Sequence, residues 1–319
     1  MSGRPFRFGV IAERFSSAGA RRELAQKAET LGYDTLLIRD HFVEEPFGHQ
    51  FAPFSALASA AAVTSTLRLG TLVIDNDYRH PAVLAKEAAT LDLLSDGRFE
   101  LGIGAGWLSE EYRRAGIPLD SAGTRISRLA EALPILRSLI NGNEVTFAGD
   151  HYTLDALPAY PAAKQQPVPL LVGGGSPRIL RLAGATADIV GILTTSVSSG
   201  VAVKVPEGRR SAAVRQRVEW IREGAGNRFD TIELSMIPTV ILTDDSGAAL
   251  DRYIESQGWN DVDREAVRDM PSVIVGAPEE IAEKLQEARR EFGFSYFIFP
   301  DRQLEDLAPV IATLSSAAR

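Results

Sequence analysis

The sequence contains no cysteine in its 319 residues. Disulfide bonds, thiolate nucleophiles and cysteine metal ligands are therefore excluded. Histidine is also scarce, and the four that are present show no metal-ligand spacing. No apolar run is long enough to span a bilayer and no basic segment precedes an apolar one at the start, so we expect a cytoplasmic protein with no membrane partner.

Clustered positive charge is missing as well. The chain has 34 basic and 42 acidic side chains, which gives a net charge of −8 with no basic block. Nucleic acid is therefore not an expected partner, because binding to phosphates needs grouped Lys and Arg. The shares of hydrophobic residues, 45%, and charged residues, 24%, are typical of a soluble globular protein.

Short apolar runs alternate with helical patterns along the whole chain. We expect about eight strands, at residues 6–12, 34–38, 67–74, 98–103, 170–172, 188–193, 232–242 and 294–299. No repeat, linker or low-complexity tract divides them. This alternation predicts one α/β domain over residues 1–319, a (β/α)8 TIM barrel.

Two segments depart from this rhythm. Residues 145–154 read as a small hairpin insertion with its turn at Gly149-Asp150. Residues 194–208 are rich in Ser, Thr, Val and Gly, and we interpret them as a mobile loop at the C-terminal face that gates the substrate.

Residues 67–107 form one complete strand-helix-strand unit with a loop at each strand exit. Its second strand ends in Gly104-Ala105-Gly106, which leaves no large side chain to block a flat ligand. Trp107 follows, and it is suited to stacking on a ring or lining a pocket. These glycines do not make a dinucleotide fingerprint, because the required third glycine and the helix are missing.

The predicted strands end in residues that carry chemistry. In a barrel the site lies at the C-terminal strand ends, and the residues expected there are Glu13, Asp40, His41, Asp75, Gly104, Gly106, Trp107, Gly174, Gly175, Ser176 and Thr194. His41 is suited to proton transfer near neutral pH. The alternative is that it only bonds loop backbone. Asp40 would hold a cofactor edge or orient His41.

Gly173-Gly174-Gly175-Ser176 precedes a helix that begins with Pro177. Bare backbone N–H groups at a helix start suit one phosphate, and Arg178 would add charge. An ordinary tight turn with a capped helix explains the same residues equally well.

These residues resemble the luciferase-like monooxygenase superfamily, in particular its coenzyme F420 branch. The match rests on residues 69–73, 79–85, 91–107, 171–176 and 32–42, in the family's order. The resemblance implies a TIM barrel, F420 as cofactor, hydride transfer to or from a small-molecule substrate, and a homodimer formed by the helices after the second and third strands. It favours His41 as the catalytic group and a phosphate at Gly174 to Ser176.

The resemblance also implies a non-prolyl cis peptide at Leu72-Val73 that supports the back of the deazaflavin, although a plain strand is an alternative. Trp107 stands where a sugar-phosphate dehydrogenase of this branch has glutamate, which puts that substrate in doubt. Glu110 and Glu111 are weak substitutes.

Two other functions stay open on the same fold. One is an FMN-dependent two-component monooxygenase, and the other is a non-catalytic flavin-binding protein. Basic residues at the rim would favour F420, whose tail is anionic; the candidates are Arg79, Arg178, Lys204, Arg209 and Arg210.

Overall fold

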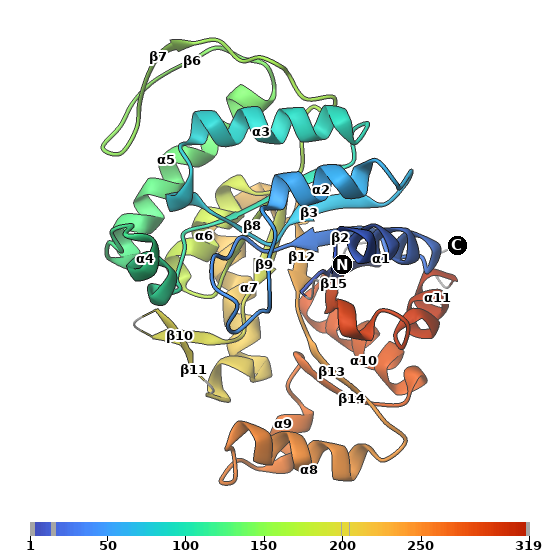
Figure 1. The fold of residues 1–319 in the computed structure, drawn as a ribbon. Coiled ribbons are helices and arrows are strands. Elements are labelled where there is room, and N and C mark those ends of the chain that lie inside the picture. The colour runs from blue at the N-terminus through green and yellow to red at the C-terminus, as the bar shows by residue number, and fades with distance from the viewer. Residues whose placement is uncertain (1–3, 14–16, 199, 204, 317–319) are drawn as a thin grey trace.

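The computed structural model describes residues 4–13, 17–198, 200–203 and 205–316. Its main sheet closes on itself, since the strand order runs β3-β2-β1-β15-β12-β9-β8-β5-β4 and β3 also pairs with β5. All these pairings are parallel. The TIM barrel predicted from the sequence is therefore confirmed (Figure 1).

The barrel strands are short and almost fully buried, as expected for parallel strands covered on both faces. They are β1 (Arg7–Ile11), β2 (Thr35–Ile38), β3 (Arg68–Thr71) continued by β4 (Ile74–Asp75), β5 (Phe99–Gly104), β8 (Leu170–Gly174), β9 (Ile189–Ile192), β12 (Glu233–Met236) and β15 (Phe294–Pro300). Leu37, Leu171, Ile189, Tyr296 and Ile298 belong to one apolar cluster, against which Leu72 and Val73 pack.

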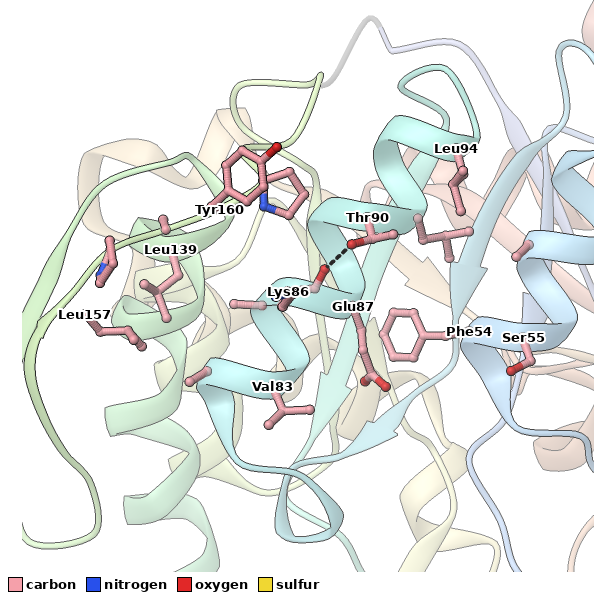
Figure 2. A pocket seen from close by; sticks show the side chains of 17 residues that line it. Phe54, Ser55, Val83, Lys86, Glu87, Thr90, Leu94, Leu139, Leu157 and Tyr160 are labelled. Atoms are coloured by element: carbon pink, nitrogen blue, oxygen red, sulfur yellow. Dashed lines mark hydrogen bonds between the residues drawn. The ribbon is translucent and has the colours of Figure 1, made fainter.

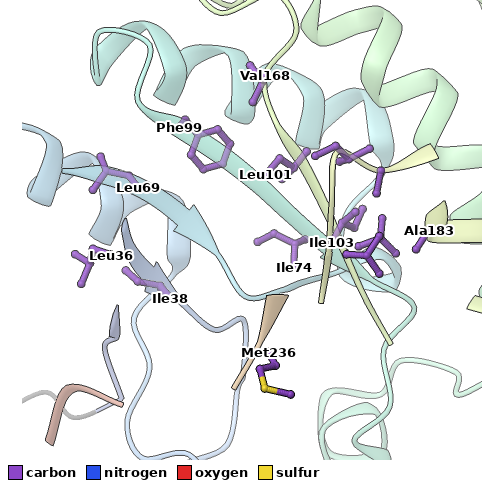
Figure 3. Packing of buried hydrophobic residues seen from close by; sticks show 14 of the residues in the cluster. Leu36, Ile38, Leu69, Ile74, Phe99, Leu101, Ile103, Val168, Ala183 and Met236 are labelled. Carbon is purple, nitrogen blue, oxygen red and sulfur yellow. The ribbon is translucent and has the colours of Figure 1, made fainter. Parts of the chain in front are cut away.

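A second and larger apolar cluster contains side chains from strands and helices. Figure 3 shows Leu36, Leu69, Phe99 and Leu101 from neighbouring strands within it. The helices that contribute are α1 (Ala18–Thr30), α2 (Pro53–Ala61), α3 (Pro81–Leu94), α5 (Ala122–Ile140), α6 (Pro177–Thr186), α7 (Ser211–Ala225), α10 (Pro278–Phe292) and α11 (Ala308–Ser316). Side-chain caps set several helix starts: Ser17 caps α1 and His80 caps α3.

The predicted hairpin insertion is present as β6 (Val145–Ala148) and β7 (Thr153–Leu157). Residues 194–208, which we expected to form a mobile loop, contain a second short hairpin, β10 (Ser196–Ser198) with β11 (Val201–Val203). Residues 199 and 204 lie outside the described residues. Mobility of this segment stays a prediction.

The single long strand predicted at residues 232–242 is wrong. β12 ends at Met236, and the next strand, β13 (Thr239–Leu242), pairs with β14 (Val273–Gly276) outside the barrel. α8 (Ser246–Gln257) and α9 (Arg264–Arg268) pack there around their own apolar cluster (Figure 1). Pro238 lacks the N–H that a central strand needs, so it marks the exit from the barrel.

Candidate active site at the barrel mouth

The parallel strands bring their C-terminal ends to one mouth. Asp40 follows β2, Asp75 ends β4, Gly106 and Trp107 follow β5, and Gly174 ends β8. Thr194 lies buried two residues beyond β9. These positions were predicted from the strand ends, and the barrel brings them to the same side of the molecule.

Asp40 is buried and ion-paired with Arg79. Both terminal nitrogens of Arg79 donate to its carboxylate, and the backbone N–H of Asp75 donates to Asp40 Oδ2 over 3.3 Å. Within the described residues, the Asp40 carboxylate has no hydrogen bond to His41. Of the two roles predicted for Asp40, orienting His41 therefore finds no support, and holding a cofactor edge remains.

His41 is oriented by Glu111 instead. Its Nδ1 lies 2.9 Å from Glu111 Oε2. Its imidazole stacks on Phe47 with ring centroids 4.6 Å apart, and the Trp107 ring lies nearly perpendicular to it with ring centroids 6.4 Å apart. The ring is thus held by one polar contact and two aromatic neighbours.

Glu111 comes from α4 (Ser109–Ala115) and its side chain is only 2% exposed. Oε1 accepts hydrogen bonds from the backbone N–H of Phe42 at 2.6 Å and of Val43 at 3.2 Å. Tyr78 donates its hydroxyl to Oε2 over 3.2 Å. Burial alone would raise the pKa of Glu111, but the bonds from His41 and the two N–H groups outweigh it, so the pKa lies below its ordinary value.

The sequence did not distinguish Glu110 from Glu111 as a replacement for the missing acid. The structure separates them, because Glu110 forms surface ion pairs with Arg113 and Arg114 while Glu111 is buried. The sequence signal that could have identified Glu111 is its position about one helical turn beyond the glycine-rich end of a strand.

The end of β5 and the residues after it form a wall of the mouth. Glycines stand at the two points where this segment packs closest against neighbouring residues, so no side chain projects there. A Cβ on Gly104 would lie 2.8 Å from Val73 Cγ2. Gly106 has φ +71°, and a Cβ there would overlap the Tyr112 hydroxyl and the Asp75 carboxylate. The Leu72-Val73 peptide is cis, as the resemblance implied, and separates β3 from β4.

The end of β8 leads through Gly175 and Ser176 into α6. Ser176 is exposed at the N-cap, and its side chain makes no capping hydrogen bond. Arg178 does not add its charge here, because it donates to Gly123 O at 2.9 Å and Ser127 Oγ at 2.7 Å on α5. Backbone N–H groups and the Ser176 hydroxyl remain at this helix start, and the buried Arg217 side chain lies beside it, donating to Gly175 O over 3.2 Å and to Gly208 O over 2.6 Å.

Other rim candidates are also engaged. Arg79 is paired with Asp40, and Arg209 donates to Thr195 Oγ1 over 3.2 Å. Arg210 is exposed. Lys204 lies outside the described residues.

A separate apolar groove of about 680 Å³ lies on the outer side of the barrel. Figure 2 shows α2, α3 and the segment after β7 around it. Val83, Leu94 and Tyr160 line it and are 54%, 65% and 84% exposed.

No helix in the described ranges is long and apolar enough to cross a membrane. The cytoplasmic location stays a prediction.

The protein is a (β/α)8 barrel, and a histidine, carboxylates and aromatic rings lie at its mouth. This is the place where barrel enzymes hold their substrates. The sequence profile of luciferase-like monooxygenases matches residues 6–296. The chain therefore belongs to the luciferase-like monooxygenase family.

Two similar proteins are named F420-dependent glucose-6-phosphate dehydrogenase. The one from Nakamurella multipartita is 34% identical over 243 residues, covering 74% of this chain and 68% of that protein. The one from Amycolatopsis mediterranei is 33% identical over 220 residues, covering 67% and 63%. This chain thus spans about two thirds of their length.

Solved structures share the fold over almost the whole chain. The coenzyme F420 dependent tetrahydromethanopterin reductase of Methanopyrus kandleri has a TM-score of 0.74 at 20% identity, with 98% of each chain covered. An F420-dependent secondary alcohol dehydrogenase has a TM-score of 0.77 at 19% identity, covering 99% of this chain and 100% of that one.

Proposed function

We propose that the protein is a coenzyme F420-dependent oxidoreductase that transfers a hydride between the deazaflavin and a small organic substrate. The observation that carries this proposal is the position of His41 at the barrel mouth, where its Nδ1 lies 2.9 Å from the buried Glu111 carboxylate. The glycines at the end of β5, Gly104 and Gly106, belong to the same mouth. The relatives named as F420-dependent dehydrogenases support the choice of cofactor.

The residues present fit such a cofactor. Close packing of Gly104 against Val73 leaves a flat surface for a ring, and the α6 start offers N–H groups to a phosphate. When bound, F420 would accept or deliver the hydride. The residues that would hold it are Asp40, Leu72, Val73, Gly104, Gly106, Trp107, Gly174, Gly175, Ser176 and Thr194.

His41 would exchange the proton that accompanies the hydride. Its ring lies within an aromatic enclosure formed by Phe47 and Trp107. Such an enclosure favours the apolar part of a substrate over a charged sugar phosphate. We therefore propose that the substrate is a neutral alcohol or carbonyl compound.

Turnover tests this proposal. Purified protein with F420 is assayed against neutral secondary alcohols, and with reduced F420 against the matching carbonyl compounds, alongside glucose 6-phosphate. We expect turnover with a neutral substrate and a loss of about 10²–10⁴-fold in kcat for His41→Asn. Full activity of His41→Asn, or turnover of glucose 6-phosphate alone, would overturn the assignment.

The FMN-dependent monooxygenase is the second candidate, since a ring wall and one phosphate site serve FMN equally well. A monooxygenase from Streptomyces bottropensis shares the fold, with a TM-score of 0.73 at 22% identity. Oxygen consumption with reduced FMN, and none with F420, would favour this alternative.

We also propose that the protein is a homodimer joined through α2 and α3. The groove between these helices is apolar, and the exposed side chains of Val83, Leu94 and Tyr160 surround it. Exposed apolar side chains gathered at one place on a surface are a feature of protein interfaces.

A further inference from the structure

His41 and Glu111 are related in a way that fixes which nitrogen of the imidazole carries hydrogen. We propose that Glu111 is a positioning residue that holds His41 with hydrogen on Nδ1 and leaves Nε2 as the atom that exchanges a proton with substrate. The consequence for turnover rests on the proposed function, whereas the assignment of the hydrogen does not.

The first step concerns what Glu111 can do. Its side chain is 2% exposed, and the other partners of its carboxylate in the described part of the chain are donors: two backbone N–H groups on Oε1 and the Tyr78 hydroxyl on Oε2. These bonds favour the ionised carboxylate, which can only accept hydrogen bonds. The contact at 2.9 Å therefore requires hydrogen on His41 Nδ1.

The second step concerns the opposite side of the ring. In a neutral imidazole only one nitrogen carries hydrogen, so Nε2 has a free lone pair when Nδ1 is occupied. No hydrogen bond to Nε2 is formed by the residues that the structure describes, and stacking on Phe47 restricts rotation of the ring. Nε2 is then free to take the hydroxyl proton of an alcohol as its carbon gives a hydride to the cofactor. In the reverse direction the same atom returns the proton as the carbonyl compound is reduced.

Glu111 also holds the loops of the barrel mouth together. Glu111 connects three separate βα loops, since α4 follows β5, Phe42 and Val43 follow β2, and Tyr78 follows β4. One buried side chain thus ties the loop that carries His41 to the remainder of the mouth. If Glu111 only held the loops together, its hydrogen bonds with the two backbone N–H groups and with Tyr78 would be sufficient. Whether His41 Nδ1 carries hydrogen would then make no difference.

The substitution Glu111→Gln separates these two roles. The backbone N–H groups of Phe42 and Val43 need an acceptor, so the glutamine oxygen takes the place of Oε1. Its NH2 group then faces His41, and Nδ1 has to accept. Hydrogen would move to Nε2, and His41 would no longer have a lone pair there.

The experiment is ¹⁵N NMR of the histidine side chains, in which the shifts and couplings of the two nitrogens report which one carries hydrogen. Only four histidines are present, and His41→Asn identifies the relevant signals. The spectrum of the wild-type protein needs neither cofactor nor substrate. Glu110→Gln is the matched control, because Glu110 is the neighbouring residue on α4 and, among the residues that the structure describes, forms ion pairs only with Arg113 and Arg114 on the surface.

We expect hydrogen on Nδ1 of His41 in the wild type and in Glu110→Gln, and a neutral Nε2–H form in Glu111→Gln. The kcat of Glu111→Gln should fall by about 10²-fold with little change in KM. A bare Nδ1 in the wild type, or an unchanged tautomer in Glu111→Gln, would overturn the inference. The wild-type spectrum decides the first point even if the variant does not fold, and absence of F420 turnover would overturn only the proposed function.

Discussion

The hydroxyl of Tyr112 lies 2.8 Å and 3.0 Å from the two carboxylate oxygens of Asp75, and both side chains are buried below the barrel mouth. Burial raises the pKa of Asp75 to about 7, and the bonds donated by the Asp77 N–H and by Tyr112 offset only part of that effect. Ionising Asp75 inside the fold therefore costs more than ionising it in water.

This pair makes stability depend on pH. The folded-state pKa of about 7 exceeds the ordinary 3.8, so the folded state binds more protons between these pH values and its stability falls as pH rises through them. We expect Asp75→Asn to raise the free energy of unfolding by about 1–3 kcal/mol at pH 8, with the gain disappearing near pH 4. Urea unfolding at both pH values measures this, and an equal gain at both would contradict it.

Glycine is required at position 106 for two reasons: its backbone has a positive φ, and neighbouring side chains leave no room for a Cβ. Gly106 and Gly116 have φ values of +71° and +70°, but only Gly106 would bring a Cβ into Tyr112 and Asp75, since nothing lies within 4 Å at Gly116. We expect Gly116→Ala to cost about 1 kcal/mol of stability from backbone conformation alone. Gly106→Ala should cost roughly 2 kcal/mol more, because the added methyl overlaps a buried polar pair. Equal losses in thermal unfolding would show that the contact does not matter.

Ser176 allows a test of the phosphate site that leaves the fold intact. Its side chain makes no cap, and a carboxylate at a helix N-terminus is favourable, so Ser176→Asp should fold at least as well as the wild type. The same negative charge repels an anionic ligand, and we expect F420 affinity to fall by about 10–100-fold. Ser176→Ala is the control and should bind within a few-fold of the wild type. Unchanged binding by Ser176→Asp would place the phosphate elsewhere.

Leu94 tests the proposed dimer. It is 65% exposed on α3 at the edge of the apolar groove. We expect Leu94→Glu to convert the dimer to monomer, since an interface cannot bury an unpaired carboxylate without a cost of several kcal/mol. Sedimentation velocity measures the mass. Leu119→Glu, at a 39% exposed leucine outside the groove, should stay dimeric; a monomeric wild type would refute the proposal.

The sequence was sufficient for the positions that depend on strand order. Asp40, Asp75 and Gly106 each follow a recognisable apolar run, and parallel strands place their ends at the same edge. The start of α6 was equally readable, because a proline suits the first helical position and the helix begins at Pro177 as expected.

Two features depended on information that local patterns do not carry. The contact between His41 and Glu111 joins positions 70 residues apart. Glu110 and Glu111 are chemically identical, so only the rotation of α4 decides which one is buried. The apolar run at 232–242 looked continuous because hydrophobicity does not distinguish a barrel strand from the separate β13, and Pro238 was the one signal of the break.

The most direct test of the proposed function is side-by-side fluorescence titration of the purified apoprotein with F420 and with FMN. We predict saturable F420 binding at least about tenfold tighter than FMN binding, a difference of about 1.4 kcal/mol. Tighter binding of FMN would contradict the deazaflavin assignment and favour a flavin monooxygenase. Binding of neither would contradict the ring wall at Gly104 and the phosphate site at Ser176 together.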